Sequence, residues 1–268
     1  MEPERSDALA DLRSILDATG HSVVLVGAYA REVTFDRAVG RATQRVTLDI
    51  DAAIPMRDWS EFEQLADAIT ASGHFRRIER DGLTFTHRNG TEIDLLPHGD
   101  IANQDRRLCW PNDATRSLSV EGFDELSAHV VLVAIGSIKI AVADLPALVA
   151  LKLFAFDDRA EHTRKDLEDL VFMLRHATES LEDRVFSELD STILSEYAYL
   201  DYGPLLLGIE LRRRLASASL HRLRAIVRAA GQRAVDLPAV YRGEGADGPV
   251  ETSRRFEALW VGLGHEGD

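Results

Sequence analysis

Residues 45–51 read Arg45-Val-Thr-Leu-Asp-Ile-Asp, and this stretch decides how the first half of the chain folds. Apolar and polar residues alternate in it, which is typical of a strand whose successive side chains point to opposite faces of a sheet. The polar residues therefore share one face: Arg45, Thr47, Asp49 and Asp51. Two carboxylates ~7 Å apart on a strand repel each other, and a divalent cation such as Mg²⁺ would neutralise them. A solvated outer face is the alternative, although Asp is depleted in strands.

A second strand carries acidic residues in the same alternating way. In Thr91-Glu-Ile-Asp-Leu-Leu, Glu92 and Asp94 face one side, and the segment follows Asn89-Gly90, a strong signal for a hairpin turn. If this strand lies beside the first, Asp94 joins Asp49 and Asp51 on one face. Three carboxylates there suit a two-metal site that holds a triphosphate and activates a hydroxyl. We read Glu92 as an ordinary exposed residue.

A glycine ends the apolar strand VVLVG at residues 23–27, and a helix is expected over residues 28–38. Glycine lets a backbone approach a phosphate closely, and a helix N-terminus offers free N–H groups to an anion. Gly27 is therefore a candidate phosphate neighbour, although a glycine in this place also simply terminates a strand.

The composition excludes several classes of protein. The chain has 268 residues, 45% of them apolar and 28% charged, which indicates a globular rather than a disordered protein. It has no unbroken apolar run long enough for a membrane helix and no signal peptide, and its single cysteine excludes a disulfide framework. We therefore expect a cytoplasmic protein without membrane contact. The net charge of −14 argues against non-specific binding to nucleic acid.

The pattern predicts an α/β fold of the α+β kind: a mixed sheet with flanking helices over residues 1–143, followed by a helical domain over residues 144–268. Residues 97–118 read as a loop, and residues 130–142 as two apolar strands or one strand with a bulge. In the helical half, residues 181–194 read as one amphipathic helix, and residues 243–253 as a flexible stretch before a short C-terminal helix.

Residues 211–233 hold seven arginines and no acidic residue, in a chain that is acidic overall. This segment could guide an RNA such as a tRNA end, dock an acidic partner, or pair internally with the acidic part of the chain. The nine histidines show no spacing typical of metal ligands.

The order of these motifs resembles the polymerase-β-type nucleotidyltransferase superfamily, and the helical half makes the chain similar to the AbiEii/AbiGii-type nucleotidyltransferases. That group includes abortive-infection proteins and type IV toxins paired with an antitoxin. The resemblance covers residues 20–210 and rests on five short segments: Val24-Leu-Val-Gly-Ala-Tyr-Ala-Arg-Glu, Arg45–Asp51, Ile93-Asp-Leu-Leu-Pro-His-Gly, Leu148–Arg159 with Arg164-Lys-Asp-Leu-Glu-Asp-Leu, and Tyr202-Gly-Pro-Leu-Leu-Leu-Gly.

The resemblance implies a role for each matching residue. Asp49 and Asp51 would bind Mg²⁺ (or Mn²⁺), and Asp94 would be the third ligand and help to deprotonate the acceptor hydroxyl. The NTP would lie beside five residues of the first half: Gly27, Ala28, Arg31, Arg45 and Thr47. Ala28 stands where the superfamily usually has Ser or Gly, and the gap from Gly27 to Asp49 is longer than usual. A plain helix-surface ion is the alternative reading of Arg31.

Three residues of the helical half would complete the site. Lys152 would contact the triphosphate, and Asp166 or Asp169 would join it from the following helix. The residues themselves allow plainer readings. Lys152 could reach solvent from an apolar helix, and the two aspartates, three residues apart, could form a surface pair with Arg164 or Lys165.

Together these features predict a Mg²⁺-dependent nucleotidyltransferase that moves a nucleoside monophosphate from an NTP to a hydroxyl of RNA, such as tRNA, or of protein. The abortive-infection resemblance implies a toxin or phage-defence factor with a cognate antitoxin. Two alternatives stay open. One is a degenerate module that binds a nucleotide or a partner without catalysis, which Ala28 suggests. The other is an antibiotic-modifying nucleotidyltransferase.

Overall fold

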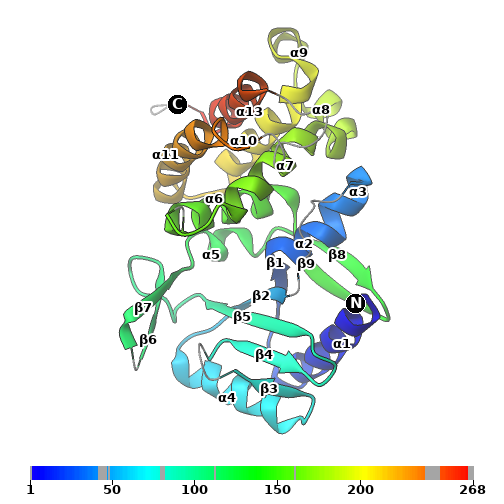
Figure 1. The fold of residues 1–268 in the computed structure, drawn as a ribbon, viewed down its shortest axis with the longest axis vertical. Helices are drawn as coiled ribbons and strands as arrows, with labels where there is room; N and C mark the ends of the chain where they lie inside the picture. Colours follow the sequence, from blue (N-terminus) through cyan, green and yellow to red (C-terminus); the bar gives the residue numbers. More distant parts are fainter. Residues whose placement is uncertain are drawn as a thin grey trace. The chain divides into compact units, whose positions relative to one another are not determined.

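The computed structural model describes residues 2–41, 47, 49–78, 82–111, 113–159, 161–238 and 248–264. The chain forms two compact units (Figure 1). The first comprises Met1–Thr34 and Gln44–Asp144, and the second comprises Phe35–Thr43 and Leu145–Asp268. The main boundary between the two units thus falls after Asp144. The segment Phe35–Thr43 groups with the second unit, and no sequence pattern indicates this.

A seven-stranded mixed sheet forms the centre of the first unit, in the order β3-β4-β5-β2-β1-β9-β8. The pairs β2–β5 and β1–β9 are parallel, and the remaining neighbours are antiparallel. This confirms the predicted mixed sheet, and residues 130–142 form two strands, the first of the two readings of this stretch. The strands are β1 (Val24–Val26), β2 (Asp49–Pro55), β3 (Phe75–Arg77), β4 (Thr84–His87), β5 (Glu92–His98), β8 (Val130–Ile135) and β9 (Ile138–Ala143).

The prediction of a loop over residues 97–118 was wrong. The strand β5 runs through Pro97 to His98, and β6 (Arg107–Trp110) pairs with β7 (Asp113–Ser119) as a separate two-stranded sheet. The register shifts between Cys109 and Trp110. The Pro-Asn sequence at 111–112 resembles loop composition, which explains the error.

The two faces of the main sheet differ in character. On β2 and β5 the side chains of Ile50, Ile54, Ile93 and Leu95 are buried on one face, and the acidic residues alternate with them on the other. The helices α1 (Glu2–Thr19) and α4 (Trp59–Ala71) contact each other and contribute their buried apolar sides to the core of this unit. The N-terminus of α4 is capped by Asp58, whose carboxylate accepts a 2.9 Å hydrogen bond from the Glu61 backbone N–H.

The helix predicted over residues 28–38 consists of three consecutive pieces. They are α2 (Gly27–Arg31), the π-helical segment η1 (Glu32–Asp36) and α3 (Arg37–Val39). A further short helix, α5 (Phe123–Leu126), follows β7.

The second unit is helical, as predicted. Asp190 divides the single helix expected over residues 181–194, because its carboxylate accepts hydrogen bonds from the backbone N–H groups of Thr192 and Ile193 and begins a new helix. Helix α13 begins at Pro249, inside the stretch expected to be flexible, while residues 239–247 lie outside the described part of the chain. The helices are α6 (Leu145–Arg159), α7 (Lys165–Ser180), α8 (Glu182–Glu188), α9 (Ser191–Glu196), η2 (Tyr199–Asp201), α10 (Tyr202–Arg214), α11 (Ser217–Ala234) and α13 (Pro249–Gly262).

Glycines set the closest helix contacts in this unit. A Cβ built on Gly208 of α10 would overlap the Leu259 carbonyl of α13, and one on Gly203 would overlap the backbone of α7 at Thr178. The Gly203 N–H also donates a 2.8 Å hydrogen bond to the Thr178 hydroxyl. The two glycines of the Tyr202–Gly208 motif thus have a packing role. Among the described helices of both units, none is long and apolar enough to cross a membrane.

Candidate active site

Three aspartates converge on the polar face of the sheet. Asp51 of β2 lies beside Asp94 of β5 in the parallel register, and Asp49 lies two residues before Asp51 on the same face. One carboxylate oxygen from each of the three lies within 4.8 Å of the others. The convergence expected from the two alternating strands is therefore present in the structure, and it places three anionic ligands around one point.

Asp51 and Asp94 each have a further neighbour in the sheet, on β1 and on β4. On one side Asp51 pairs with Val26 of β1, the residue before Gly27, and on the other side Asp94 pairs with Thr84 of β4. The Thr84 hydroxyl donates a 2.6 Å hydrogen bond to Oδ1 of Asp94. This bond fixes one carboxylate oxygen of Asp94. Sequence reasoning missed Thr84, because its role depends on the exact pairing of β4 with β5.

Gly27 lies directly against the carboxylate of Asp51. Its φ of +71° belongs to the left-handed region that favours glycine, and a Cβ built on it would overlap Oδ2 and Cγ of Asp51. Gly27, the first residue of α2, therefore leaves room for the carboxylate of Asp51, a candidate catalytic residue. Its expected place beside the phosphates of an NTP stays a prediction.

Of the other four residues expected beside the nucleotide, the structure describes three, and all three are buried. Ala28 is buried, and Arg31 is only 2% exposed, so the reading of Arg31 as a helix-surface ion was wrong. Thr47 is also buried, and its backbone carbonyl accepts a hydrogen bond from the Arg5 guanidinium. Arg45 lies outside the described residues. Contact of these four residues with a nucleotide stays a prediction.

In the second unit, Lys152, Asp166 and Asp169 form a cluster of their own. The Lys152 ammonium lies 3.1 Å from Asp166 and 2.8 Å from Asp169, and Arg159 lies 2.8 Å from Asp166. Both aspartates are only 2% exposed, so the reading of a surface pair with Arg164 or Lys165 was wrong. The Lys152 side chain is itself largely buried and held by two carboxylates. Its expected contact with a triphosphate stays a prediction.

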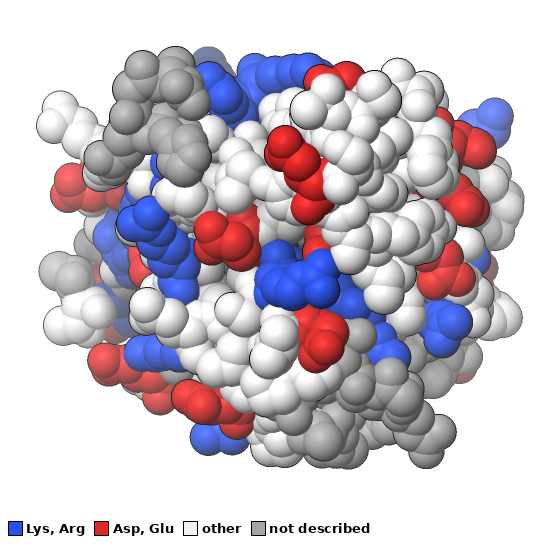
Figure 2. Space-filling model, turned by 90° about the horizontal axis from the view of Figure 1, so that it is seen from above, with Lys and Arg blue, Asp and Glu red and all other residues white. Residues whose placement is uncertain are grey.

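The arginine-rich segment pairs extensively within the second unit. Arg222 lies 2.9 Å from Asp157, and Arg224 donates a 2.7 Å hydrogen bond to the Leu263 carbonyl. The Arg228 guanidinium lies 4.1 Å from the centre of the Trp260 ring, which is a cation–π distance. Internal pairing, one of the three readings of this segment, is thus present. Over the described surface seen in Figure 2, basic and acidic side chains are interspersed.

A cluster that sequence reasoning missed joins α1 to the hairpin of β3 and β4. Asp11 Oδ2 lies 2.5 Å from Nδ1 of His74 and 3.0 Å from Nε2 of His87. Burial raises the pKa of Asp11, but the hydrogen bonds from the two histidines and the nearby charges of His74 and Arg88 outweigh it, so the pKa is lowered. The spacing of 11, 74 and 87 has no periodicity, and only the hairpin pairing of residues 75 and 87 could have indicated it.

A cavity of the first unit lies away from the three aspartates. It has a volume of about 480 Å³ and is lined by residues such as His21, Arg57 and Glu61 near Pro55, the end of β2 opposite Asp49. Arg57 and Glu61 pair with each other at 3.2 Å. Because none of the three converging aspartates lines this cavity, we place the candidate site at the aspartates.

No model of a protein family matches the chain, and no curated protein matches it. Three solved structures are similar in outline. The first is the solution structure of the antibiotic-resistance factor ANT(2'')-Ia, with a TM-score of 0.38 and 16% identity. The match covers 75% of this chain and 97% of that protein's chain. The crystal structure of ANT(2'')-Ia with adenylyl-2''-tobramycin has a TM-score of 0.38 and 17% identity, covering 72% and 99%.

The third is an antigenic nucleotidyltransferase-like protein from Paracoccidioides brasiliensis, with a TM-score of 0.44, 16% identity and coverage of 75% and 93%. Likenesses at these scores carry no argument about the chemistry of this chain. The resemblance to the AbiEii/AbiGii-type proteins stays a prediction, and the functional argument rests on the residues themselves.

Proposed function

We propose that this protein is a nucleotidyltransferase that transfers a nucleoside monophosphate from an NTP to a hydroxyl group. The observation that carries the proposal is the convergence of Asp49, Asp51 and Asp94, with one oxygen of each within 4.8 Å of the others. Three carboxylates are a donor set for Mg²⁺ or Mn²⁺, which prefer oxygen ligands and keep positions open for phosphate oxygens. Bound there, the ions would supply charge neutralisation of the triphosphate and activation of the hydroxyl.

The chain's own residues would perform the remaining steps. Asp49 and Asp51 would hold the nucleotide's phosphates through the metal, and Gly27 leaves the Asp51 carboxylate the space it needs. Asp94 would accept the proton of the attacking hydroxyl while the oxygen forms a bond to the α-phosphorus. The bond from the α-phosphorus to the bridging oxygen breaks, and pyrophosphate leaves. Catalysis of this kind consists mainly of positioning and charge stabilisation.

The finer features of the proposal follow the sequence resemblance. The acceptor is a hydroxyl of RNA, such as tRNA, or of protein, and the biological role is that of a type IV toxin or phage-defence factor with an antitoxin. By the same resemblance Lys152 would contact the triphosphate and Asp166 or Asp169 would join it, but the ion pairs among these three residues favour a structural role. The alternative of a non-catalytic nucleotide-binding module predicts NTP binding without turnover.

The test is incorporation of label from α-labelled NTPs, with Mg²⁺, into tRNA, cell-extract protein and an aminoglycoside. The double variant Asp49→Asn/Asp51→Asn should reduce labelling roughly a thousandfold or more, because bound metal supplies several kcal/mol and each 1.36 kcal/mol is tenfold in rate. Glu92→Gln is the matched control: Glu92 pairs with Asp49 in the register but stands outside the converging group, and its loss should leave labelling unchanged.

Two results would count against the proposal. Labelling that persists in the double variant would remove the metal role of Asp49 and Asp51. Calorimetric binding of NTP that is independent of Mg²⁺, together with no labelled acceptor, would favour the non-catalytic module instead.

A further inference from the structure

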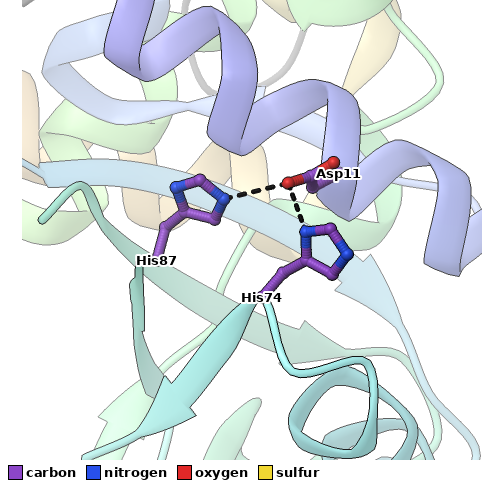
Figure 3. A group of neighbouring side chains, drawn as sticks. All are labelled: Asp11, His74 and His87. Carbon is purple, nitrogen blue, oxygen red and sulfur yellow. Dashed lines mark hydrogen bonds and ion pairs between the residues drawn. The ribbon is translucent and has the colours of Figure 1, made fainter. Parts of the chain in front are cut away.

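Three side chains from separate parts of the first unit meet at one point (Figure 3). Asp11 projects from α1, His74 directly precedes β3, and His87 is the last residue of β4. One ligand atom of each lies within 4.8 Å of the others. The pairing of β3 with β4 sets His87 opposite Phe75 and so beside His74. Helix α1 brings Asp11 to the two histidines.

We propose that Asp11, His74 and His87 form a binding site for a metal ion of the zinc class, separate from the carboxylates of β2 and β5. Two imidazole nitrogens and one carboxylate oxygen are a frequent donor set for Zn²⁺, with one position left for water. Nitrogen donors distinguish this site from the all-oxygen group, which suits Mg²⁺. The inference does not depend on the proposed transferase activity.

The distances allow an ion to enter after a small movement. Zinc lies about 2.0–2.2 Å from nitrogen and oxygen ligands, so tetrahedral ligand atoms stand about 3.3 Å apart. The Asp11 oxygen now lies 2.5 and 3.0 Å from the two ring nitrogens. A retreat of this oxygen by less than about 1 Å gives the two oxygen–nitrogen separations that zinc requires. Asp11 and His74 are partly exposed, which gives the ion a path and supplies the water ligand.

The ring of His87 is held in place before any metal binds. The residue is 3% exposed, and its ring lies 5.0 Å from that of Phe75 and is stacked at 6.4 Å on that of His74. Its Nδ1 accepts a 3.3 Å hydrogen bond from the backbone N–H of Asn89, so the proton of the neutral ring is on Nε2. A metal at Nε2 requires the other tautomer, with the proton on Nδ1, and breaks this long bond because both groups would then be donors.

Arg88 is the positively charged neighbour of the site. Its guanidinium lies 3.4 Å from Asp11 Oδ2, and its side chain is 64% exposed. A cation at the three ligands would be repelled by Arg88, which has solvent to move into. Removal of this charge should therefore strengthen metal binding, and a change in that direction is hard to explain by general damage to the fold.

The test uses the full-length chain carrying Asp49→Asn/Asp51→Asn, so that the all-oxygen group does not compete. After treatment with a chelator, the protein is titrated with Zn²⁺ by chelator competition, and with Co²⁺ by visible absorption. We expect one equivalent of tightly bound Zn²⁺ and a Co²⁺ spectrum typical of mixed nitrogen and oxygen ligands. His87→Gln should weaken Zn²⁺ at least as much as loss of an outer-shell partner does, about 10–100-fold.

Two further variants keep the outcome clear. His21→Gln removes a histidine just beyond α1 that lies outside the cluster, and it should leave affinity unchanged. Arg88→Ala should bind Zn²⁺ several-fold more tightly at low ionic strength. The proposal is overturned if no stoichiometric Zn²⁺ binds, if His87→Gln binds as tightly as its parent, or if Arg88→Ala does not bind more tightly. The cluster is then only a hydrogen-bonded clasp between α1 and the hairpin.

Discussion

The aspartates of the sheet and those of the helical unit are both gathered by neighbouring elements, but their surroundings differ. In the helical unit Asp166 and Asp169 are buried against Lys152 and Arg159, so two acidic side chains meet two basic ones. In the sheet, Asp49, Asp51 and Asp94 turn their oxygens toward one another, and Asp94 is held by a neutral hydroxyl.

Under the proposed function, this difference separates a structural use of aspartate from a catalytic one. A buried carboxylate balanced by the protein's own lysine contributes to the fold, and loss of the partner leaves an uncompensated charge. Carboxylates that face one another store repulsion that a bound divalent cation relieves. The first group should therefore respond to mutation through stability, and the second through metal binding and activity.

The largest expected effect is on stability, from Lys152→Met. Methionine keeps the length of the side chain but leaves Asp166 and Asp169 without their shared ammonium, which should lower the free energy of unfolding by about 3 kcal/mol. Urea unfolding at pH 7 measures this loss.

Two variants serve as controls for Lys152→Met. Arg159→Met removes a half-exposed partner of Asp166 and should lower the free energy of unfolding by less than about 1 kcal/mol. Asp51→Asn, measured with a chelator present, should be neutral or stabilising because it removes repulsion. An equal loss in Asp51→Asn and Lys152→Met would contradict the distinction between the two clusters.

A smaller effect is expected from Gly27→Ala, which tests the space around Asp51. The left-handed backbone alone should cost about 1–2 kcal/mol with a Cβ present. Overlap with the Asp51 carboxylate should add to this and displace a metal ligand. We expect a loss of about 2 kcal/mol or more, and no increase in melting temperature on addition of Mg²⁺, whereas the parent should be stabilised by it.

Gly20→Ala is the matched control for this change. Gly20 has a similar φ of +75°, but a Cβ built there meets no atom within 4 Å in the part of the chain that the structure describes. It should show the backbone strain alone and keep the response to Mg²⁺. If Gly27→Ala behaves like Gly20→Ala in both measurements, the close contact with Asp51 has no role.

Alternation was enough to predict the strands and the common face of Asp49 and Asp51, because the period of a strand is a local property. Burial of Asp166, Asp169 and Arg31 could not be predicted in this way. It depends on which helices pack together, and charged residues are rarely buried in general.

The register of the β4–β5 hairpin was also beyond the sequence. Asn89-Gly90 predicts a hairpin, and the structure has one, but its loop contains three residues, Arg88–Gly90, with Gly90 at a φ of +93°. A two-residue Asn-Gly loop would shift the pairing by one residue, and a shift of one moves every side chain to the opposite face. The observed loop is therefore the reason that Thr84 stands opposite Asp94.

The smallest effect tests that register through Thr84→Val. Valine keeps the shape of threonine but removes the 2.6 Å hydrogen bond to Asp94, which should lower the free energy of unfolding by about 1 kcal/mol. With one oxygen released, Asp94 should need a several-fold higher Mg²⁺ concentration for half-maximal activity. Urea unfolding and a Mg²⁺ titration of nucleotidyl transfer measure the two quantities.

Thr86→Val is the control on the same strand and the same face. The Thr86 hydroxyl is buried and has no hydrogen-bond partner among the described residues, so its removal should be neutral or stabilising. If Thr84→Val lowers the free energy of unfolding and Thr86→Val does not, the loss comes from the hydrogen bond to Asp94 rather than from the packing of β4. If the two variants have equal effects on stability and on the Mg²⁺ requirement, the Thr84 hydroxyl does not position Asp94. The contrast between the two clusters would then no longer include this hydrogen bond.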